Sequence, residues 1–494
     1  MISKSLKAIL NCSRKFSTSK IFNSPLEAIY DINDGSTVAM GGFGIAGIPE
    51  NGVLALIEKG TKKLKIISNV AGITDWGIGL LLEKFQVSDM FASYVGENAR
   101  FEKQFLEGNV GFNMIPQGSL VEKCRDSSAG IPAFYAKAGL NTYIEDGGFP
   151  TKVDPKTKAP CSVLQPKERR DFVDTNYMLE EILYPDFALI KAYQADKKGN
   201  LRFRKTARNF NPDMAGCAPI TIAEVEHIVD ELPPDQVHFP GCFVDRVYKA
   251  PKVFHKIERL RIRKPGQAAK ISENPKDRVR DFIAKRAAKE IKDGMYANLG
   301  AGIPMSVSNI VEGKVQVDLQ GENGLVCIGP YPLEHEVDAD VINAGKESVT
   351  TKPGYSISRS SDAFGMMRGK HIHLTMLGAL QVSQHGDLAN WIIPKQKVKG
   401  MGGAMDLVSC GSEVVIAMEH NSPKGEPKVV KDCTIPLTGK GIVTTLVTEK
   451  AVFRFKPEGM ILVEIAKNLT VDELRKCTTA EFIVSPDLKE IEDD

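Results

Sequence analysis

The chain has 494 residues, of which 42% are hydrophobic and 26% charged, and its formal net charge is +2. A chain of this length is longer than one hydrophobic core usually organises, so we predict two domains. The composition is typical of a globular protein. Acids and bases are well mixed and no apolar run approaches a membrane span. We therefore expect neither a nucleic-acid surface nor a transmembrane helix.

The first 20 residues form a basic, serine-rich segment, and no acidic residue precedes Glu27. Ile2, Leu6 and Ile9 would share one face of a helix. These features predict a mitochondrial transit peptide over residues 1–20, which we exclude from the fold. A disordered basic tail is the alternative.

Two helix starts divide the remaining chain into similar halves. Ser24 can cap a helix that has Pro25 at its first position, and this helix is expected to run to Asp34-Gly35. In the second half, a helix is expected from Asn274-Pro275 to Asp293-Gly294. The two halves therefore begin in the same way.

Each of these helices is followed by a short apolar strand and a glycine-rich loop that ends in Gly-Ile-Pro. The loops span residues 41–49 and 300–304. The strands beyond them also correspond in pairs: 64–67 with 315–319, 187–190 with 374–377, and 221–226 with 415–420.

This repeat predicts two homologous open α/β domains with largely parallel sheets. Residues 21–262 would form the N-terminal domain and residues 276–486 the C-terminal domain. A polar stretch rich in proline, glycine and charge, residues 263–275, would link them. Two similar domains favour an active site in the cleft between them.

The first loop contains a Gly-x-Gly-x-x-Gly pattern at Gly42–Gly47, so a nicotinamide-dependent oxidoreductase must be considered. The strand that follows ends in Ser68-Asn69 and supplies no acidic residue for a ribose. The glycine pattern also recurs in the second half at 300–302. Tight turns explain most of these glycines, although their backbone N–H groups could instead line a ligand cleft.

A glutamate stands between glycines in the second half, at Gly321-Glu322-Asn323-Gly324, directly after a predicted strand. Open α/β sheets place ligands at such strand ends. By itself the motif is more often an Asn-Gly turn with an exposed glutamate. Another Glu-Asn pair, at Glu97, lacks the following glycine, so Glu322 is the better nucleophile. In the repeat, Asn69 falls near the position of Glu322.

The cysteines give no sign of a metal or disulfide framework. There are nine, an odd number, and none forms a Cys-x-x-Cys pair. Reduced thiols in an intracellular compartment are the simpler interpretation.

These motifs together resemble the family I CoA-transferases over nearly all of the chain after residue 20. The matching runs are 41–51, 93–102, 116–118, 208–211, 321–324, 343–347, 386–391 and 400–406. In that family both halves are α/β domains, and bacterial relatives keep them as separate subunits. Gly321 and Val70 depart from the family, which commonly has serine and asparagine there.

The resemblance implies transfer of CoA from succinyl-CoA to a 3-oxo acid such as acetoacetate, through a covalent thioester on Glu322. The other active-site residues that it implies are Asn69, Gln117, Asn298, Lys346, Gly402 and Gly403. Gln117 would donate to developing oxyanions, as would the backbone N–H groups of the two glycines. Lys346 would contact CoA or the acid.

The resemblance also implies that CoA enters only as a substrate, with no resident cofactor or metal, and that the partners are small molecules. It further implies a homodimer in the mitochondrial matrix. Two alternatives stay open: the same fold with another acid or water as acceptor, and a non-enzymatic protein that binds CoA esters.

Overall fold

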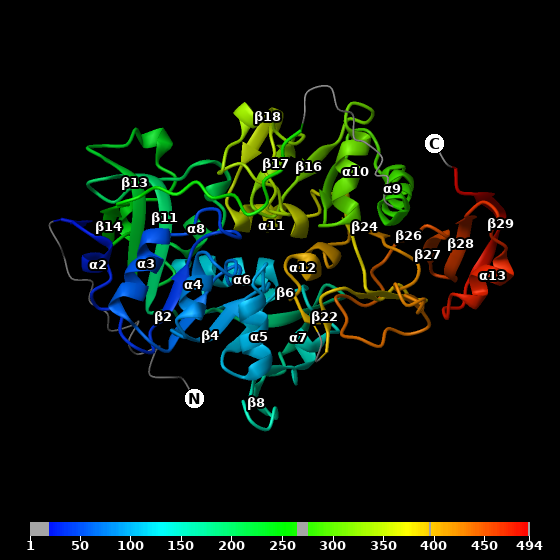
Figure 1. Cartoon of the computed structure of the whole chain (residues 1–494), viewed down its shortest axis with the longest axis horizontal. Coiled ribbons are helices and arrows are strands. Elements are labelled where there is room, and N and C mark those ends of the chain that lie inside the picture. The colour runs from blue at the N-terminus through cyan, green and yellow to red at the C-terminus, as the bar shows by residue number, and fades with distance from the viewer. Residues whose placement is uncertain (1–18, 264–274, 395–396, 493–494) are drawn as a thin grey trace.

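The structure is a computed structural model that describes residues 19–263, 275–394 and 397–492. The predicted transit peptide, residues 1–20, and the predicted linker, residues 263–275, lie almost entirely outside the described residues. Two large sheets dominate the described chain, one from each half (Figure 1).

The first half forms a nine-stranded sheet within the described residues. All pairs along its main path are parallel, and only β12 is antiparallel, to β11. The order is β1 (Ile21–Phe22), β14 (Arg246–Lys249), β13 (Ile220–Val229), β11 (Phe187–Asp196), β2 (Thr37–Met40), β3 (Leu64–Ile67), β4 (Val87–Ala92) and β5 (Gly111–Met114), with β12 (Leu201–Arg202) beside β11.

The second half forms a ten-stranded sheet from its described residues. Its central strands are parallel, and antiparallel pairs extend it on both sides. The order is β18 (Thr351–Ile357), β17 (Leu325–Ile328), β16 (Asp318–Gln320), β15 (Tyr296–Leu299), β19 (Leu374–Leu377), β24 (Glu413–Ala417), β26 (Thr445–Val447), β27 (Ala451–Lys456), β28 (Gly459–Ile465) and β29 (Ile483–Glu490).

The predicted repeat is confirmed by the strand order. The first sheet contains the run β13-β11-β2-β3, and the second contains β24-β19-β15-β16 in the same relative order. Each strand of one run is the sequence counterpart of the strand in the other. The residues that follow β3 and β16 therefore occupy equivalent edges, and these residues include Asn69 and Glu322.

Small sheets and helices complete the described fold. The remaining strands are β6 (Ala133–Ala136), β9 (Arg169–Phe172), β10 (Thr175–Glu181), β7 (Pro150–Val153), β8 (Pro160–Val163), β20 (Gln381–Ser383), β21 (Leu388–Ala389), β25 (Val429–Val430), β22 (Ile392–Ile393) and β23 (Lys397–Val398). The helices are α2 (Pro25–Ala28), α3 (Glu50–Lys59), α4 (Ile78–Glu83), α5 (Ala99–Glu107), α6 (Gln117–Ala129), α7 (Tyr143–Asp146), α8 (Asn211–Met214), α9 (Pro275–Ala288), α10 (Ile303–Val311), α11 (Ser360–Arg368), α12 (Ala404–Val408) and α13 (Val471–Lys476).

Both helices expected to end at Asp-Gly are shorter than predicted. Ser24 caps α2 as expected, but α2 makes only one turn. After it, the Lys59 ammonium donates to the carbonyl oxygens of Ile29 and Ile32. The helix α9 ends at Ala288, after which the backbone hydrogen bonds reach only three residues back, as in a 3₁₀ turn.

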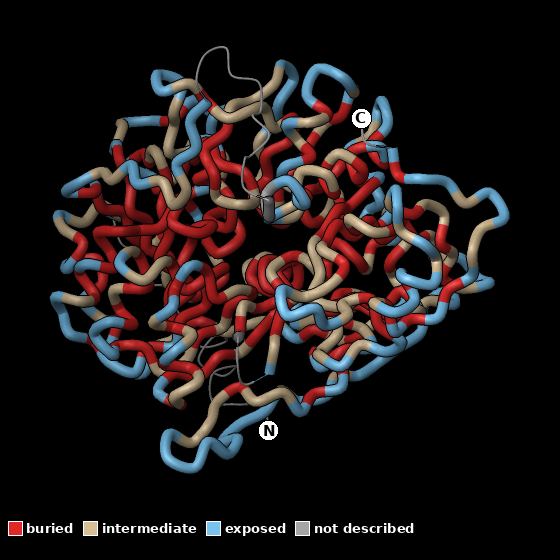
Figure 2. The backbone as a smooth tube through the Cα atoms, turned by 45° about the vertical axis from the view of Figure 1, so that its right-hand side comes forward, coloured by how far each residue is buried: buried red, intermediate tan, exposed pale blue. Residues whose placement is uncertain are grey.

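The two halves share a continuous apolar core where α6 and α8 of the first meet α11 and α12 of the second (Figure 1). Leu120 and Met214 belong to the same buried cluster as Phe364 and Leu407. Figure 2 shows buried backbone through the interior of both halves, with exposed segments around the outside. This close packing holds residues of both halves at fixed positions across their boundary.

Candidate active site

Glu322 lies in a firmly anchored turn after β16. The Asn323 side chain donates to the Ile342 carbonyl oxygen at 2.7 Å. Gly324 has φ of +96°, and a Cβ there would lie 2.1 Å from the Ser358 carbonyl oxygen, so only glycine fits. The turn therefore directs Glu322 into a cavity, which excludes the alternative of a glutamate on an ordinary surface turn.

All seven predicted site residues line this single cavity of about 640 Å³. Asn69 and Gln117 come from the first half, and the other five come from the second. A volume of this size is in the usual range for small-molecule sites, about 300–1,000 Å³. The predicted cleft between the halves is therefore present, and Glu322 lies in it.

Burial raises the pKa of Glu322 from its ordinary value of 4.5 to about 7. The nearby Asp406 carboxylate raises it further, whereas Lys346 and Gln117 lower it. A carboxylate taken out of water beside another negative charge binds a proton more readily. The ionised form is therefore a stronger base and a better nucleophile than an ordinary carboxylate.

Two buried amide groups beside Glu322 have no hydrogen-bond partner among the described residues. These are the Asn69 side chain, 1% exposed, and the Gln117 Nε2 atom, whose residue is 3% exposed and which interacts only with the Glu322 carboxylate, whose pKa it lowers. Buried polar groups are nearly always bonded, so donors that face a cavity without a protein acceptor are available to a bound molecule. Asn298 differs, because its Nδ2 donates to the Gln320 carbonyl oxygen and Oε1.

The Gly402-Gly403 pair approaches Glu322 closely but offers fewer donors than expected. The Gly402 N–H already donates to the Ser93 carbonyl oxygen at 3.0 Å. Gly403 lies against the carboxylate, since a Cβ there would be 2.3 Å from Glu322 Oε1. Of the two predicted backbone donors, only the Gly403 N–H is therefore available to a substrate oxygen.

Lys346 points into the cavity from a tight turn. Its backbone is left-handed, with φ of +62°, and the Asn343 side chain accepts from the Glu347 N–H and donates to its carboxylate. The ammonium lies over the Tyr94 ring at 4.9 Å and is 4.0 Å from Glu258 Oε1. An opposite charge and an aromatic face hold the cation where an anionic substrate could reach it.

Sequence reasoning missed two acidic residues beside the predicted ones, Asp406 near Glu322 and Glu258 near Lys346. Asp406 lies in the matching run 400–406, but nothing in the motif assigned it a role. Glu258 comes from the segment before the linker and carries no local signal. Glu97, the rejected nucleophile, pairs with Arg259 at 2.6 Å and is about half exposed.

The first glycine loop, which raised the oxidoreductase alternative, is explained by packing. A Cβ at Gly47 would lie 2.5 Å from the Ala207 carbonyl oxygen. The loop carbonyl oxygens of Ala46 and Gly47 accept from the Asn209 and Asn211 side chains. The glycines therefore allow a close backbone approach, and Phe43 of the loop lines the cavity.

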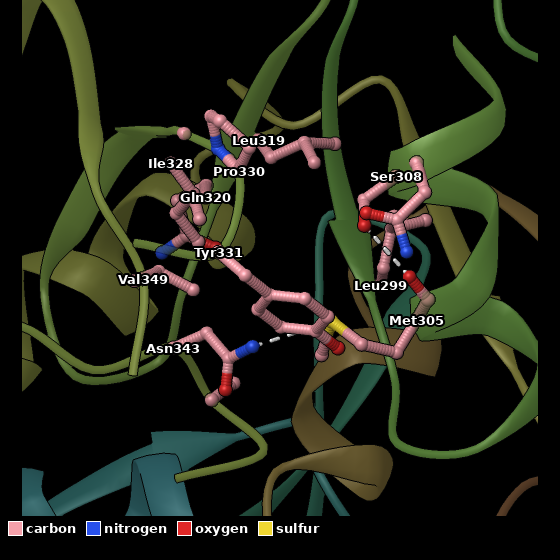
Figure 3. A pocket seen from close by; sticks show the side chains of 13 residues that line it. Leu299, Met305, Ser308, Leu319, Gln320, Ile328, Pro330, Tyr331, Asn343 and Val349 are labelled. Atoms are coloured by element: carbon pink, nitrogen blue, oxygen red, sulfur yellow. Dashed lines mark hydrogen bonds between the residues drawn. The ribbon is translucent and has the colours of Figure 1, made fainter. Parts of the chain in front are cut away.

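A second, much smaller cavity shares lining residues with the site (Figure 3). Leu299 and Ala344 line both cavities, and the Tyr331 ring and the Met305 side chain fill much of the smaller one. Its volume of about 20 Å³ accommodates about one water molecule. No substrate of the size of an organic acid fits there.

Two other features are absent from the described chain. None of its helices combines the length and apolar character that crossing a membrane requires. No group of three or more histidine, cysteine, aspartate or glutamate residues in it is arranged to hold a metal ion.

Comparisons with known proteins agree on one family. The family model described as Coenzyme A transferase matches residues 22–250 and 280–476. The chain is 48% identical over 472 residues to a mouse protein named mitochondrial succinyl-CoA:3-ketoacid coenzyme A transferase 2B, covering 95% of this chain and 90% of that one.

Two other matches bear on organisation and fold. The chain is 54% identical over 206 residues to a Helicobacter pylori protein named as one of the subunits of a succinyl-CoA:3-ketoacid coenzyme A transferase, covering 42% of this chain and 99% of that protein. The crystal structure of an acyl-CoA transferase from Escherichia coli O157:H7 has a TM-score of 0.75 and 21% identity, covering 96% and 95% of the two chains. This structural match confirms the predicted fold class.

Proposed function

The chain belongs to the coenzyme A transferase family, and we propose that it transfers CoA from succinyl-CoA to a 3-oxo acid such as acetoacetate. The family assignment makes it a CoA-transferase with CoA thioesters and small acids as substrates. The names of its relatives support this substrate pair. The single observation that carries the chemistry is Glu322, held in the interdomain cavity beside two unpaired amides.

In the proposed mechanism, the Glu322 carboxylate attacks the thioester carbonyl carbon of succinyl-CoA. The C–S bond breaks, CoA thiolate leaves, and a mixed anhydride forms. The thiolate then attacks the Glu322 carbonyl carbon, which releases succinate and leaves a glutamyl-CoA thioester. The 3-oxo acid enters, and the same steps in reverse yield the new thioester and the free carboxylate.

Each attack places negative charge on a carbonyl oxygen. The Gln117 amide and the Gly403 N–H are the donors that we propose for these oxyanions, with Asn69 beside them. One such preorganised donor contributes about 3–4 kcal/mol to transition-state stability. Asn298 is proposed to act through Gln320, by keeping the ends of β15 and β16 together.

The Lys346 ammonium is proposed to bind the carboxylate of the acid or the CoA chain. Its aromatic and acidic neighbours fix its position without using all of its hydrogen-bond donors. We propose that substrate bound in the cavity excludes water, which would hydrolyse the anhydride and the thioester.

The proposal extends to the remaining sequence-based predictions. Residues 21–262 and 276–486 would be the two domains, in line with the two segments of the family match. The relatives named mitochondrial support a location in the matrix. A homodimer and the lack of a resident cofactor or metal stay predictions.

Mass spectrometry after incubation with succinyl-CoA tests the covalent route. Protein denatured after incubation should carry a CoA-sized adduct on the peptide that contains Glu322. Acetoacetate should discharge the adduct, whereas acetate should not. Glu322→Gln should form no adduct. Turnover by the wild type without any adduct would contradict the mechanism, and discharge by acetate would contradict the acceptor.

A further inference from the structure

The first turn of α6, which carries Gln117, is held by side chains from the other half of the chain. The Gly118 N–H donates to Asp406 Oδ2 at 2.8 Å. Arg368 of α11 donates to the Gly118 carbonyl oxygen at 3.4 Å and forms an ion pair with Glu122. The helix N-terminus is thus capped by a carboxylate 288 residues away in sequence.

The contact between Asp406 and Gly118 leaves no free space. A Cβ on Gly118, the second residue of α6, would lie 2.2 Å from Asp406 Oδ1 and 2.9 Å from the Phe364 ring, so a larger residue would displace Asp406. Asp406 is 1% exposed, and its Oδ1 has no hydrogen-bond partner among the described residues. Exposed N–H groups and the dipole of a helix N-terminus stabilise such a carboxylate.

Asp406 links two segments of the proposed site, the start of α6 with Gln117 and the start of α12 with Gly403. Gln117 precedes the glycine that Asp406 binds, and the Gln117 N–H donates to the Gly402 carbonyl oxygen at 3.1 Å. Asp406 itself belongs to α12, which begins directly after Gly403. One carboxylate therefore fixes the Gln117 side chain and the Gly403 backbone relative to each other.

We propose that Asp406 is a positioning residue of the transfer reaction, which holds the Gln117 amide and the Gly403 N–H against Glu322 across the boundary between the halves. This inference rests on the proposed function. The Asp406 side chain is 1% exposed and does not line the cavity, so it acts through the groups that do.

The charge of Asp406 has a second effect on the same reaction. The charged or polar groups that act on Glu322 are Asp406, Lys346 and Gln117, and those that act on Asp406 are Arg368, Glu180 and the Gly118 N–H. Asp406 raises the free energy of ionised Glu322. Its repulsion disappears when Glu322 becomes a neutral anhydride or thioester, which favours acylation.

A double-mutant cycle tests the positioning role. Asp406→Ala and Gln117→Ala should each lower kcat about 100-fold, the usual effect of losing one oxyanion donor, with KM for succinyl-CoA within about threefold. The loss in the double variant should be at least about 10-fold smaller than the product of the two single losses, because part of the effect of Asp406 is exerted through Gln117. Losses that multiply to about 10,000-fold, or an Asp406→Ala enzyme with wild-type kcat, would overturn the proposal.

If Asp406→Ala does not fold, the isosteric variant Asp406→Asn still tests the role of Asp406. It keeps an oxygen for the Gly118 N–H but lacks the charge, so the acid limb of the kcat/KM profile should move to lower pH. The matched control is Asp213→Asn. Asp213 is an equally buried carboxylate that caps α11 across the same boundary, accepting from the Ser361 N–H and hydroxyl.

The control should leave the acid limb where the wild type has it, because Asp213 is not among the groups that act on Glu322. An unmoved limb in Asp406→Asn, or an equal shift in both variants, would overturn the inference. Wild-type protein that forms no CoA adduct would refute the proposed function and this inference with it. An active wild type with unaffected Asp406 variants would refute this inference alone.

Discussion

Gly403→Ala should disable the enzyme while leaving its fold intact. The Gly403 backbone has φ of −86° and ψ of −1°, which any residue adopts, so alanine introduces no backbone strain. Its new Cβ would lie 2.3 Å from Glu322 Oε1 and 2.6 Å from Glu322 Cδ. The clash is with the end of a flexible side chain, which can yield.

The size of the effect follows from the distance that the carboxylate must move. The Cβ···Oε1 separation has to grow from 2.3 Å to an ordinary contact of at least 3.4 Å, a displacement of about 1.1 Å. A misplacement of about 1 Å costs about 100-fold in rate. We expect kcat to fall by this factor, equivalent to about 2.7 kcal/mol in the activation barrier.

Steady-state formation of the new thioester, separated by chromatography, measures this loss. Gly365→Ala is the matched control, because a Cβ there meets open space in α11. Thermal unfolding should show both variants folded, with kcat reduced only in Gly403→Ala. A Gly403→Ala enzyme with kcat within threefold of the wild type would refute the close approach between this glycine and Glu322.

Four other predictions concern the pH dependence of activity, the stability of a Glu322 variant, the Asn69 and Asn298 amides, and a buried ion pair. Protonated Glu322 is not a nucleophile, so kcat/KM should fall as the pH drops through about 7, as an activity profile would show. Since the folded pKa exceeds the ordinary value of 4.5, the wild type loses stability as the pH rises from 4.5 to about 7. In denaturant titrations above pH 7, the free energy of unfolding of Glu322→Gln should therefore be about 3 kcal/mol larger than that of the wild type. Below pH 4.5 the two proteins should show no such difference. Asn69→Ala should lower kcat but hardly change stability, because the Asn69 amide is unpaired. Asn298→Ala should lower the free energy of unfolding by about 1–3 kcal/mol in thermal unfolding, because it leaves Gln320 without its hydrogen-bond donor. Lys191→Met should destabilise the fold by about 3–5 kcal/mol in urea titrations, because it leaves the buried Glu50 carboxylate, 3.0 Å from the Lys191 ammonium, without its cation. Unchanged stability in Lys191→Met would contradict the last prediction.

The sequence alone was sufficient for the architecture and for the main candidate. Apolar strands followed by glycine loops recur at matching intervals, and such local patterns depend only on neighbouring residues. They predicted the two sheets, whose strand order agrees with the repeat. The glycine-flanked Glu322 at a strand end was found in the same way, and motif resemblance supplied the residues expected around it.

Only the tertiary structure decided which groups face Glu322 and which are already occupied. The Gly402 N–H donates to the Ser93 carbonyl oxygen, and the Asn298 amide donates to Gln320. The carbonyl groups of Ile29 and Ile32, just beyond α2, accept from Lys59. Asp406 acquires its importance from Gly118, far away in the chain. Hydrogen bonds and charges act through space over a few ångströms, and packing of the two halves determines which distant residues come that close.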